Sequence, residues 1–207
     1  MPAPFSIPKT INGYDFFECT SSFQKAIRRC DEDNAMFWAV ELYNSKRVGN
    51  INAREYVWKR MFVMLSEDVG LANPQLPQQI WSLYQIYPML AEKNDKHEPE
   101  KLHFTHAVLL LVRSPKSRLV DWGLIHHFRT HDSNLIEPMD CALDKHTQRG
   151  KRMGRGFDHF FAEGCKLNQH DKQDREDEYM ESSRIILVGE PAKKDLFGNE
   201  AEEEQQP

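Results

Sequence analysis

Residues 66–75 read SEDVGLANPQ and precede the most regular helical pattern in the sequence. In residues 76–91 the apolar side chains recur at helical spacing, which predicts an amphipathic helix. Gly70 suits the end of the helix before it, because glycine takes left-handed backbone conformations without a Cβ clash. Asn73 and Pro74 match an N-cap followed by a proline at the first helical position. The stretch therefore predicts two helices joined by a tight hinge.

Helical patterns continue on both sides of this hinge. Capping residues and prolines predict helix starts at Ser21, at Asp31 or Asp33, at Asn52, at Pro99 or Glu100, and at Ser114-Pro115. The helix after Glu100 is apolar nearly all round, so we expect it to lie at the centre of a bundle. Residues 45–51 are expected to form a loop, and Phe157, Phe160 and Phe161 a short last helix. Only Arg184–Val188 fits a short edge strand, or else an extended arm.

Composition and charge divide the chain unevenly. The net charge is −5, but residues 1–156 carry 21 basic and 18 acidic side chains, whereas residues 157–207 carry 6 basic and 14 acidic ones. We expect an all-α fold, a bundle of about six to seven helices, with an extended arm at residues 1–19 and a helical domain at 20–166. From residue 167 the chain is too polar to bury much apolar area, so residues 167–207 are expected to form an acidic, largely disordered tail.

Cysteine usage and hydropathy point to a cytoplasmic protein. Cys19, Cys30, Cys141 and Cys165 have no CxxC spacing, so we interpret them as reduced thiols rather than as a zinc site or a disulfide frame. The sequence shows no signal peptide. The densest apolar run, residues 107–112, is far shorter than a membrane span. We therefore expect no membrane association.

A basic, glycine-containing stretch follows at residues 144–159. Its five cations are Lys145, Arg149, Lys151, Arg152 and Arg155, and no acid occurs between Lys145 and Gly156. Glycine allows close backbone approach, and Lys and Arg suit phosphate. The nucleotide-binding motif Gly-x-x-x-x-Gly-Lys-Ser/Thr does not occur. Two interpretations of this stretch therefore remain open: a loop that contacts phosphate, or a solvated basic turn before a helix.

Two short segments resemble motifs of one protein family. Residues 66–74 are similar to the hinge in the C-terminal domain of the RarA/MgsA family of AAA+ replication-associated recombination ATPases, which includes the eukaryotic Werner-helicase-interacting protein. Residues 113–117, Arg-Ser-Pro-Lys-Ser, resemble a second family segment that reads Ala-Pro-Lys-Ser. Residues 35–38, 54–64 and 143–156 are similar to further family segments in the same order. The resemblance covers about residues 20–165, which is most of the expected folded body.

The resemblance implies a helical collar of the clamp-loader type, which in the family drives homotetramer formation. Its hinge residues here would be Ser66, Glu67, Asp68, Gly70, Pro74, Ser114 and Pro115. In the family this domain follows an ATPase core and a lid domain, and neither is present in these residues, so ATP hydrolysis does not carry over. We expect no enzymatic activity and no cofactor.

Family members act at stalled replication forks, bind DNA ends and gaps, and associate with single-strand-binding protein. DNA and that protein are therefore candidate partners of a homo-oligomer. The candidate nucleic-acid-binding residues are Lys116, Arg118, Lys145, Arg149, Lys151, Arg152 and Arg155. In the alternative interpretation these cations hold the acidic tail or an acidic partner. Lys193–Phe197 also resembles the end of a bacterial sliding-clamp-binding peptide, which makes a sliding clamp a further candidate.

Two features could indicate an enzyme instead. Glu67 and Asp68 form a carboxylate pair, but between two helices they most simply cap a turn or pair with Arg or Lys across the interface. His131-Asp132 is the dipeptide of HD-type metal phosphohydrolases, and His127 and His131 share a helical face. Further ligands would have to come from His103, His106 and Asp144. We assign no catalytic residue and no metal site; the alternatives are such a phosphohydrolase, or a scaffold for a separate ATPase.

Overall fold

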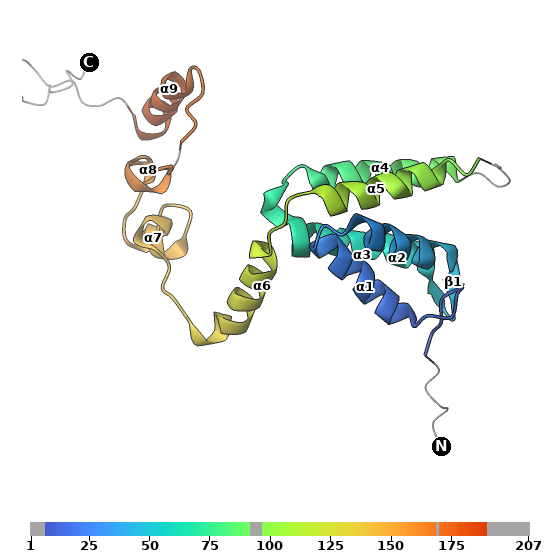
Figure 1. The fold of residues 1–207 in the computed structure, drawn as a ribbon. Coiled ribbons are helices and arrows are strands. Elements are labelled where there is room, and N and C mark those ends of the chain that lie inside the picture. Colours follow the sequence, from blue (N-terminus) through green and yellow to red (C-terminus); the bar gives the residue numbers. More distant parts are fainter. Residues whose placement is uncertain (1–6, 92–96, 169, 190–207) are drawn as a thin grey trace, which may run out of the picture. The chain divides into compact units, whose positions relative to one another are not determined.

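The computed structural model describes residues 7–91, 97–168 and 170–189, and within these ranges every regular element except one short hairpin is helical (Figure 1). The expected all-α class is confirmed. By their contacts the residues form two compact units, Met1–Asn134 (unit 1) and Leu135–Pro207 (unit 2).

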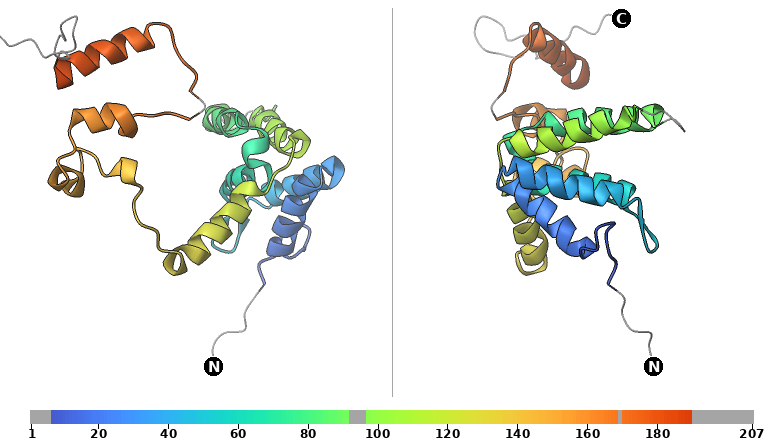
Figure 2. Two further views of the ribbon diagram at one scale, coloured as in Figure 1. Left: turned by 90° about the vertical axis from the view of Figure 1, so that its left-hand side faces the viewer. Right: turned by 45° about the vertical axis from the view of Figure 1, so that its right-hand side comes forward.

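Unit 1 contains six α-helices, a hairpin and three short turns of π- or 3₁₀-helix among its described residues. In chain order these are α1 (Phe16–Arg28), α2 (Glu32–Asn44), β1 (Arg47–Val48), β2 (Ile51–Asn52), α3 (Ala53–Met64), η1 (Leu65–Val69), η2 (Gly70–Ala72), α4 (Leu76–Leu90), α5 (Glu100–Arg113), α6 (Leu119–Thr130) and η3 (His131–Ser133). Helices α4 and α5 lie side by side as one layer over α1, α2 and α3 (Figure 1, Figure 2). Helix α6 contacts this bundle at η1 and η2.

Helix α5 packs against α1, α2, α3 and α4, which confirms its expected central position. The apolar faces of these helices meet in one buried cluster. Its largest fully buried side chains include Trp58, Phe16, Phe23, Ile27, Leu42, Met61, Met64, Leu76, Ile80 and Leu111. Removing side chains of this size from water contributes about 1.5–3 kcal/mol each, so burial of the cluster is the main stabilising term of unit 1.

Local capping signals identified three of the helix starts. Asp31 accepts a hydrogen bond from the Asn34 N–H and caps α2, and Asn52 accepts one from the Glu55 N–H and caps α3. Helix α5 begins at Glu100, directly after Pro99. These three predictions are confirmed. At α2 and α3 the N-cap side chain satisfies a donor within the first turn of its own helix, whereas α5 begins after a proline without a side-chain cap.

Four local predictions in unit 1 are wrong. Helix α1 begins at Phe16, since Asp15 rather than Ser21 caps it by accepting the Phe17 N–H at 2.8 Å and the Glu18 N–H at 3.1 Å. Helix α4 begins two residues after Pro74. Helix α6 begins five residues after Ser114, and the segment expected to be a loop forms most of the hairpin β1–β2. At the turn of this hairpin Gly49 has a positive φ of 58°, which favours glycine.

Apart from its last helix, the elements of unit 2 are short. They are η4 (Asp140–Ala142), α7 (Gln148–Arg152), α8 (Phe157–His159), η5 (Phe160–Gly164) and α9 (Glu176–Val188). The expected short helix at the phenylalanines is confirmed, whereas the expected strand or extended arm at Arg184–Val188 is wrong because these residues are the end of α9. Helix α9 also lies within residues 167–207, which we expected to be largely disordered. The division into arm, collar-like domain and tail stays a prediction, and the units defined by contacts divide the chain inside the range 20–166.

Candidate functional site

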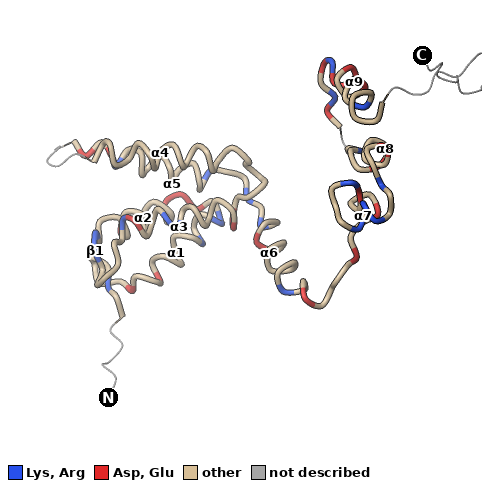
Figure 3. Tube along the Cα trace, turned by 180° about the vertical axis from the view of Figure 1, so that it is seen from behind, with Lys and Arg blue, Asp and Glu red and all other residues tan. Residues whose placement is uncertain are grey.

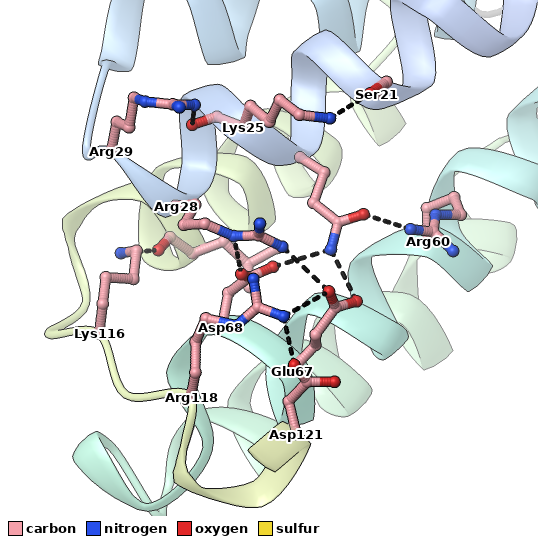
Figure 4. A network of polar contacts seen from close by, with 12 residues as sticks. Ser21, Lys25, Arg28, Arg29, Arg60, Glu67, Asp68, Lys116, Arg118 and Asp121 are labelled. Atoms are coloured by element: carbon pink, nitrogen blue, oxygen red, sulfur yellow. Dashed lines mark hydrogen bonds and ion pairs between the residues drawn. The ribbon is translucent and has the colours of Figure 1, made fainter. Parts of the chain in front are cut away.

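The first hinge motif carries a buried carboxylate. Turn η1 places Asp68 inside unit 1, where its side chain is fully buried, and the Arg28 guanidinium Nε donates to its Oδ1 (Figure 4). The Gln24 amide donates to the other oxygen, Oδ2, at 3.0 Å. Gln24 and Arg28 lie four residues apart on α1 and so share a face. A buried carboxylate with a donor on each oxygen is satisfied, which identifies a structural anchor between α1 and η1.

Glu67 extends the same network towards α6. Its carboxylate accepts hydrogen bonds from Arg28 at 2.9 Å, from Gln24 at 2.7 Å and from Arg118 at 3.4 Å. Arg60 of α3 donates to the Gln24 side-chain oxygen (Figure 4). The network therefore joins α1, α3, η1 and the start of α6 through two carboxylates, which confirms that Glu67 and Asp68 pair with Arg across a helix interface.

The second family-like segment meets the first one directly. The Ser117 N–H donates to the Asp68 carbonyl oxygen at 3.0 Å. Asn73 donates to the Ser114 hydroxyl at 3.1 Å, and that hydroxyl donates to the Leu110 carbonyl oxygen at 2.7 Å. Asn73 and Ser114 are therefore partners of each other, and neither is the helix N-cap that we predicted.

Gly70 permits a close approach of the first segment to Ser117 and to Val120 of α6. Its φ is 50°, and a Cβ on this residue would lie 3.1 Å from the Val120 Cγ2 atom and 3.6 Å from the Ser117 carbonyl oxygen. Glycine is thus required both by the backbone conformation and by the contact with α6. The remaining predicted hinge residues, Ser66, Pro74 and Pro115, are exposed.

Two of the cations that we had considered for nucleic acid belong to this hinge. The Lys116 ammonium donates to the Leu111 carbonyl at 2.8 Å and the Val112 carbonyl at 3.0 Å, and so satisfies free acceptors at the end of α5. Burial lowers the pKa of Lys116. Arg118 donates to Glu67 and Asp121, and its guanidinium lies 4.6 Å from the centre of the Trp122 ring. Both cations are occupied by contacts within unit 1.

The basic segment in unit 2 is a short helix rather than an open loop. Thr147 caps α7 by accepting the Gly150 N–H at 3.0 Å. Gly150 is buried, and a Cβ there would lie 1.9 Å from the Asp144 carbonyl oxygen. This glycine therefore allows the chain to pack on itself, whereas Gly154 and Gly156 have open space around them.

The cations of the basic segment differ in how far they are engaged. Arg155 donates to the Asp140 carboxylate at 2.6 Å and to the Leu143 carbonyl at 3.0 Å, so it is a structural residue. The Lys145 ammonium lies 3.0 Å from the centre of the Phe157 ring. Arg149 makes one 3.4 Å contact with the exposed Glu137. Lys151 and Arg152 are exposed on α7, where cations follow one another in Figure 3.

Asp144 and His146 form a polar pair at the start of the basic segment. The Asp144 carboxylate accepts the His146 backbone N–H at 2.9 Å and lies 2.8 Å from the His146 Nδ1 atom. These hydrogen bonds hold the pKa of Asp144 below its usual range. The pair closes the turn that precedes Thr147 and α7.

The histidines considered for metal binding do not converge in the described parts of the chain. His131 and Asp132 are exposed in η3, and the rings of His126 and His127 contact each other at 4.9 Å. Within residues 7–91, 97–168 and 170–189, no three His, Cys, Asp or Glu side chains group closely enough to hold a metal ion.

Sequence reasoning missed Gln24, Arg28 and Arg60 as members of the hinge network. One signal was available, since Gln24 and Arg28 interrupt an otherwise apolar helical stripe that includes Phe23 and Ile27. Polar residues on a buried face need partners, but their partners here lie about forty residues away and have no local signature.

Comparison with known proteins identifies the family. Residues 29–185 match the family model described as "MgsA AAA+ ATPase C terminal". The chain is 27% identical over 149 residues to the "Replication-associated recombination protein A" of Bacillus subtilis (strain 168), a match that covers 72% of this chain and 33% of that relative. The chain thus spans about a third of the length of the curated relative that it matches. None of the described helices combines the length and apolar composition needed to span a bilayer. With most of its length inside the family model and both family-like hinge segments in contact, this chain belongs to the MgsA AAA+ ATPase C-terminal family.

Proposed function

We propose that this chain is a non-catalytic accessory module for DNA replication and recombination that self-associates, as a tetramer, through helix α6. The relative from Bacillus subtilis is named a replication-associated recombination protein, which supports the cellular role. The observation that carries self-association is the exposure of α6. Its exposed apolar side chains are Leu119, Val120, Trp122, Leu124, Ile125 and Phe128, and none of the residues of this helix is buried.

This face is unusual for an isolated chain. Phe128 is 82% exposed and Leu124 is 57% exposed, although each would contribute about 1.5–3 kcal/mol on burial. Soluble monomers seldom expose contiguous apolar patches of more than a few hundred Å², and larger ones mark interaction sites. The hinge network fixes the start of α6 on unit 1, so the face would be presented in one orientation to a second copy.

Sedimentation velocity tests this proposal through a double substitution, Leu124→Asp with Phe128→Asp. We expect the variant to sediment as a monomer with unchanged helix content, because both side chains are exposed and make no core contact. Leu102→Asp is the matched control: Leu102 is 72% exposed on α5, and its substitution should leave the assembly intact. An unchanged sedimentation coefficient in the double variant would remove α6 as the interface.

For the contact with DNA we propose the basic segment of unit 2, narrowed to Lys145, Arg149, Lys151 and Arg152. Arg155, Lys116 and Arg118 make internal hydrogen bonds and are better explained as structural residues. A self-associating chain would present several copies of this segment, and weak phosphate contacts gain affinity by repetition. Nothing in the segment indicates base specificity, so binding should depend on salt rather than on sequence.

Charge reversal separates this proposal from a pure scaffold for a separate ATPase. We expect Arg149→Glu, Lys151→Glu and Arg152→Glu together to weaken binding to gapped DNA and to lower the slope of log K against log salt by about 2–3. The control reverses Lys25, Arg29 and Lys59, three exposed cations of unit 1, with the same change in net charge. If both variants lost the same DNA affinity, the loss would be a general effect of net charge. Binding of the separate ATPase without any binding of DNA would favour the scaffold.

Single-strand-binding protein and a sliding clamp remain proposed partners. The clamp-binding resemblance at Lys193–Phe197 lies outside the described residues. Deleting residues 193–198 without loss of affinity for a sliding clamp would end that part of the proposal.

A further inference from the structure

Two adjoining pockets lie where the hairpin β1–β2 leads into α3. The first has a volume of about 360 Å³ and is lined by Lys46, Arg47, Asn52 and Arg54. The second has a volume of about 350 Å³ and is lined by Asn52, Arg54, Glu55, Trp58, Tyr84, Tyr87 and Pro88. Because Asn52 and Arg54 line both, the pockets are neighbours that one ligand could fill together.

The first pocket gathers three cations that lack an acidic partner. Among the described residues no carboxylate forms an ion pair with Lys46, Arg47 or Arg54, and the nearby Glu55 is paired with Lys59 at 2.6 Å. Arg54 is fixed in place, since its guanidinium lies 4.3 Å from the centre of the Tyr43 ring and its Nε donates to the Tyr43 carbonyl at 3.4 Å. Like charges that converge without a counter-charge favour a bound anion.

The start of α3 adds to this positive potential. The helix begins at Ala53, beside the pocket, and the positive end of its dipole is directed towards its first turn. Lys contributes a point charge and Arg a planar fork that can donate two parallel hydrogen bonds to an oxyanion. The chemistry of the first pocket therefore suits a phosphate.

The second pocket is aromatic. The Tyr84 and Tyr87 rings lie 5.3 Å and 5.4 Å from that of the buried Trp58. The Tyr87 hydroxyl is hydrogen-bonded to the Tyr43 hydroxyl at 2.9 Å, which fixes that ring. The buried Trp58 indole N–H has no hydrogen-bond partner among the described residues. Fixed aromatic walls next to an unsatisfied donor suit a flat ring that carries acceptors.

We propose that these pockets form a nucleotide-binding site, with the phosphate between Lys46, Arg47 and Arg54 and the base against Tyr84 and Tyr87. A nucleotide joins an anion to a flat ring through a single sugar, and the two pockets share their boundary residues. Binding involves no bond making or breaking. The same chemistry is offered by a free nucleotide and by a nucleotide within a single strand. The site shares no residue with the basic segment or with α6.

Calorimetric titration of the full chain with adenosine monophosphate, adenosine and inorganic phosphate tests the proposal. We expect the monophosphate to bind at least about tenfold more tightly than either fragment, because only it fills both pockets. Arg47→Ala should lower the affinity for the monophosphate to about the affinity for adenosine. Tyr84→Leu should lower it to about the affinity for inorganic phosphate. Arg29→Ala removes an exposed cation outside both pockets and should change nothing. Because Arg47 is exposed, we expect the Arg47→Ala variant to keep the fold. Circular dichroism verifies this.

A short single-stranded oligonucleotide, titrated into the variant with Arg149, Lys151 and Arg152 reversed, separates the two sources. If the oligonucleotide binds more tightly than the monophosphate, the natural ligand is a nucleotide within a strand. If the oligonucleotide binds more weakly, the natural ligand is a free nucleotide. The proposal is overturned if inorganic phosphate binds as tightly as the monophosphate, or if Arg47→Ala and Tyr84→Leu leave the affinity unchanged. It is also overturned if only an acidic peptide binds in a manner sensitive to these variants.

Discussion

Unit 1 buries a continuous cluster of large side chains, whereas the described part of unit 2 buries one large apolar side chain, Leu143. In unit 1 even the charged residues of the hinge take partners from distant helices. In unit 2 the ion pairs are mostly local, such as Arg175 with Glu178 and Arg184 with Glu181. Local pairs of this kind contribute only a few tenths of a kcal/mol each. Unit 1 is therefore fixed by tertiary packing, and unit 2 by caps and turns.

The largest expected effect comes from the buried carboxylate of unit 1. Asp68→Ala removes the buried one of the two carboxylates that accept from Arg28 and Gln24, and only Glu67 remains as their acceptor. We expect the free energy of unfolding of unit 1 to fall by about 2–4 kcal/mol, since Arg28 remains partly exposed. Urea unfolding followed by tryptophan fluorescence measures the change.

Glu32→Ala is the control for this prediction. It removes the exposed ion pair between Glu32 and Arg113, which should have no measurable effect on stability. If the two variants lost the same amount of stability, the hinge network would be no more than a surface feature.

A smaller effect, confined to the other unit, is expected from Gly150→Ala. The new Cβ would overlap the Asp144 carbonyl oxygen, and relieving this clash should cost unit 2 about 1–3 kcal/mol. Amide hydrogen exchange should show faster exchange across α7 and unchanged exchange in α5. Gly156→Ala has open space around it and should leave both regions as they are. Faster exchange throughout unit 1 would show that the two units do not respond separately.

The smallest effect concerns acid pH. The pKa of Asp144 is lowered by its hydrogen bonds from His146, so its carboxylate stabilises the folded state above the ordinary pKa of about 3.9. This contribution is lost as the pH falls through the lowered folded-state value. Protection of the α7 amides, expressed relative to their intrinsic exchange rate at each pH, should therefore fall below about pH 4, and Asp144→Asn should flatten that dependence. Asp132→Asn, at an exposed position, is the control. Unchanged or higher protection of the α7 amides below about pH 4, relative to their intrinsic exchange rates, would contradict the assigned role.

The sequence predicted those features whose cause lies within a few residues. The caps Asp31 and Asn52 each satisfy a donor three residues ahead, so a local pattern was sufficient. Asn73 and Ser114 show the same local pattern, but the predicted N-caps were wrong. These two residues bind each other across 41 positions instead. Their pairing depends on how the two hinge segments pack, which local propensity does not encode.

The same distinction applies to the candidate sites. The run of cations from Lys145 to Arg155 was evident, but the internal bonds of Arg155 were not, since Asp140 precedes it by 15 positions. Helix α9 was missed because its polar composition offers little to bury, although its Arg–Glu pairs at three-residue spacing are visible in the sequence. The pockets beside α3 are lined by residues far apart in the sequence, such as Lys46 and Tyr87, and no local pattern links these residues.

The mass of the chain in solution, measured by light scattering, tests most directly whether α6 is a self-association face. We expect a mass near four times the 24.3 kDa of one chain for the unaltered protein, and a mass near that of one chain for Leu124→Asp with Phe128→Asp. A single-chain mass for the unaltered protein at every concentration would contradict self-association through α6.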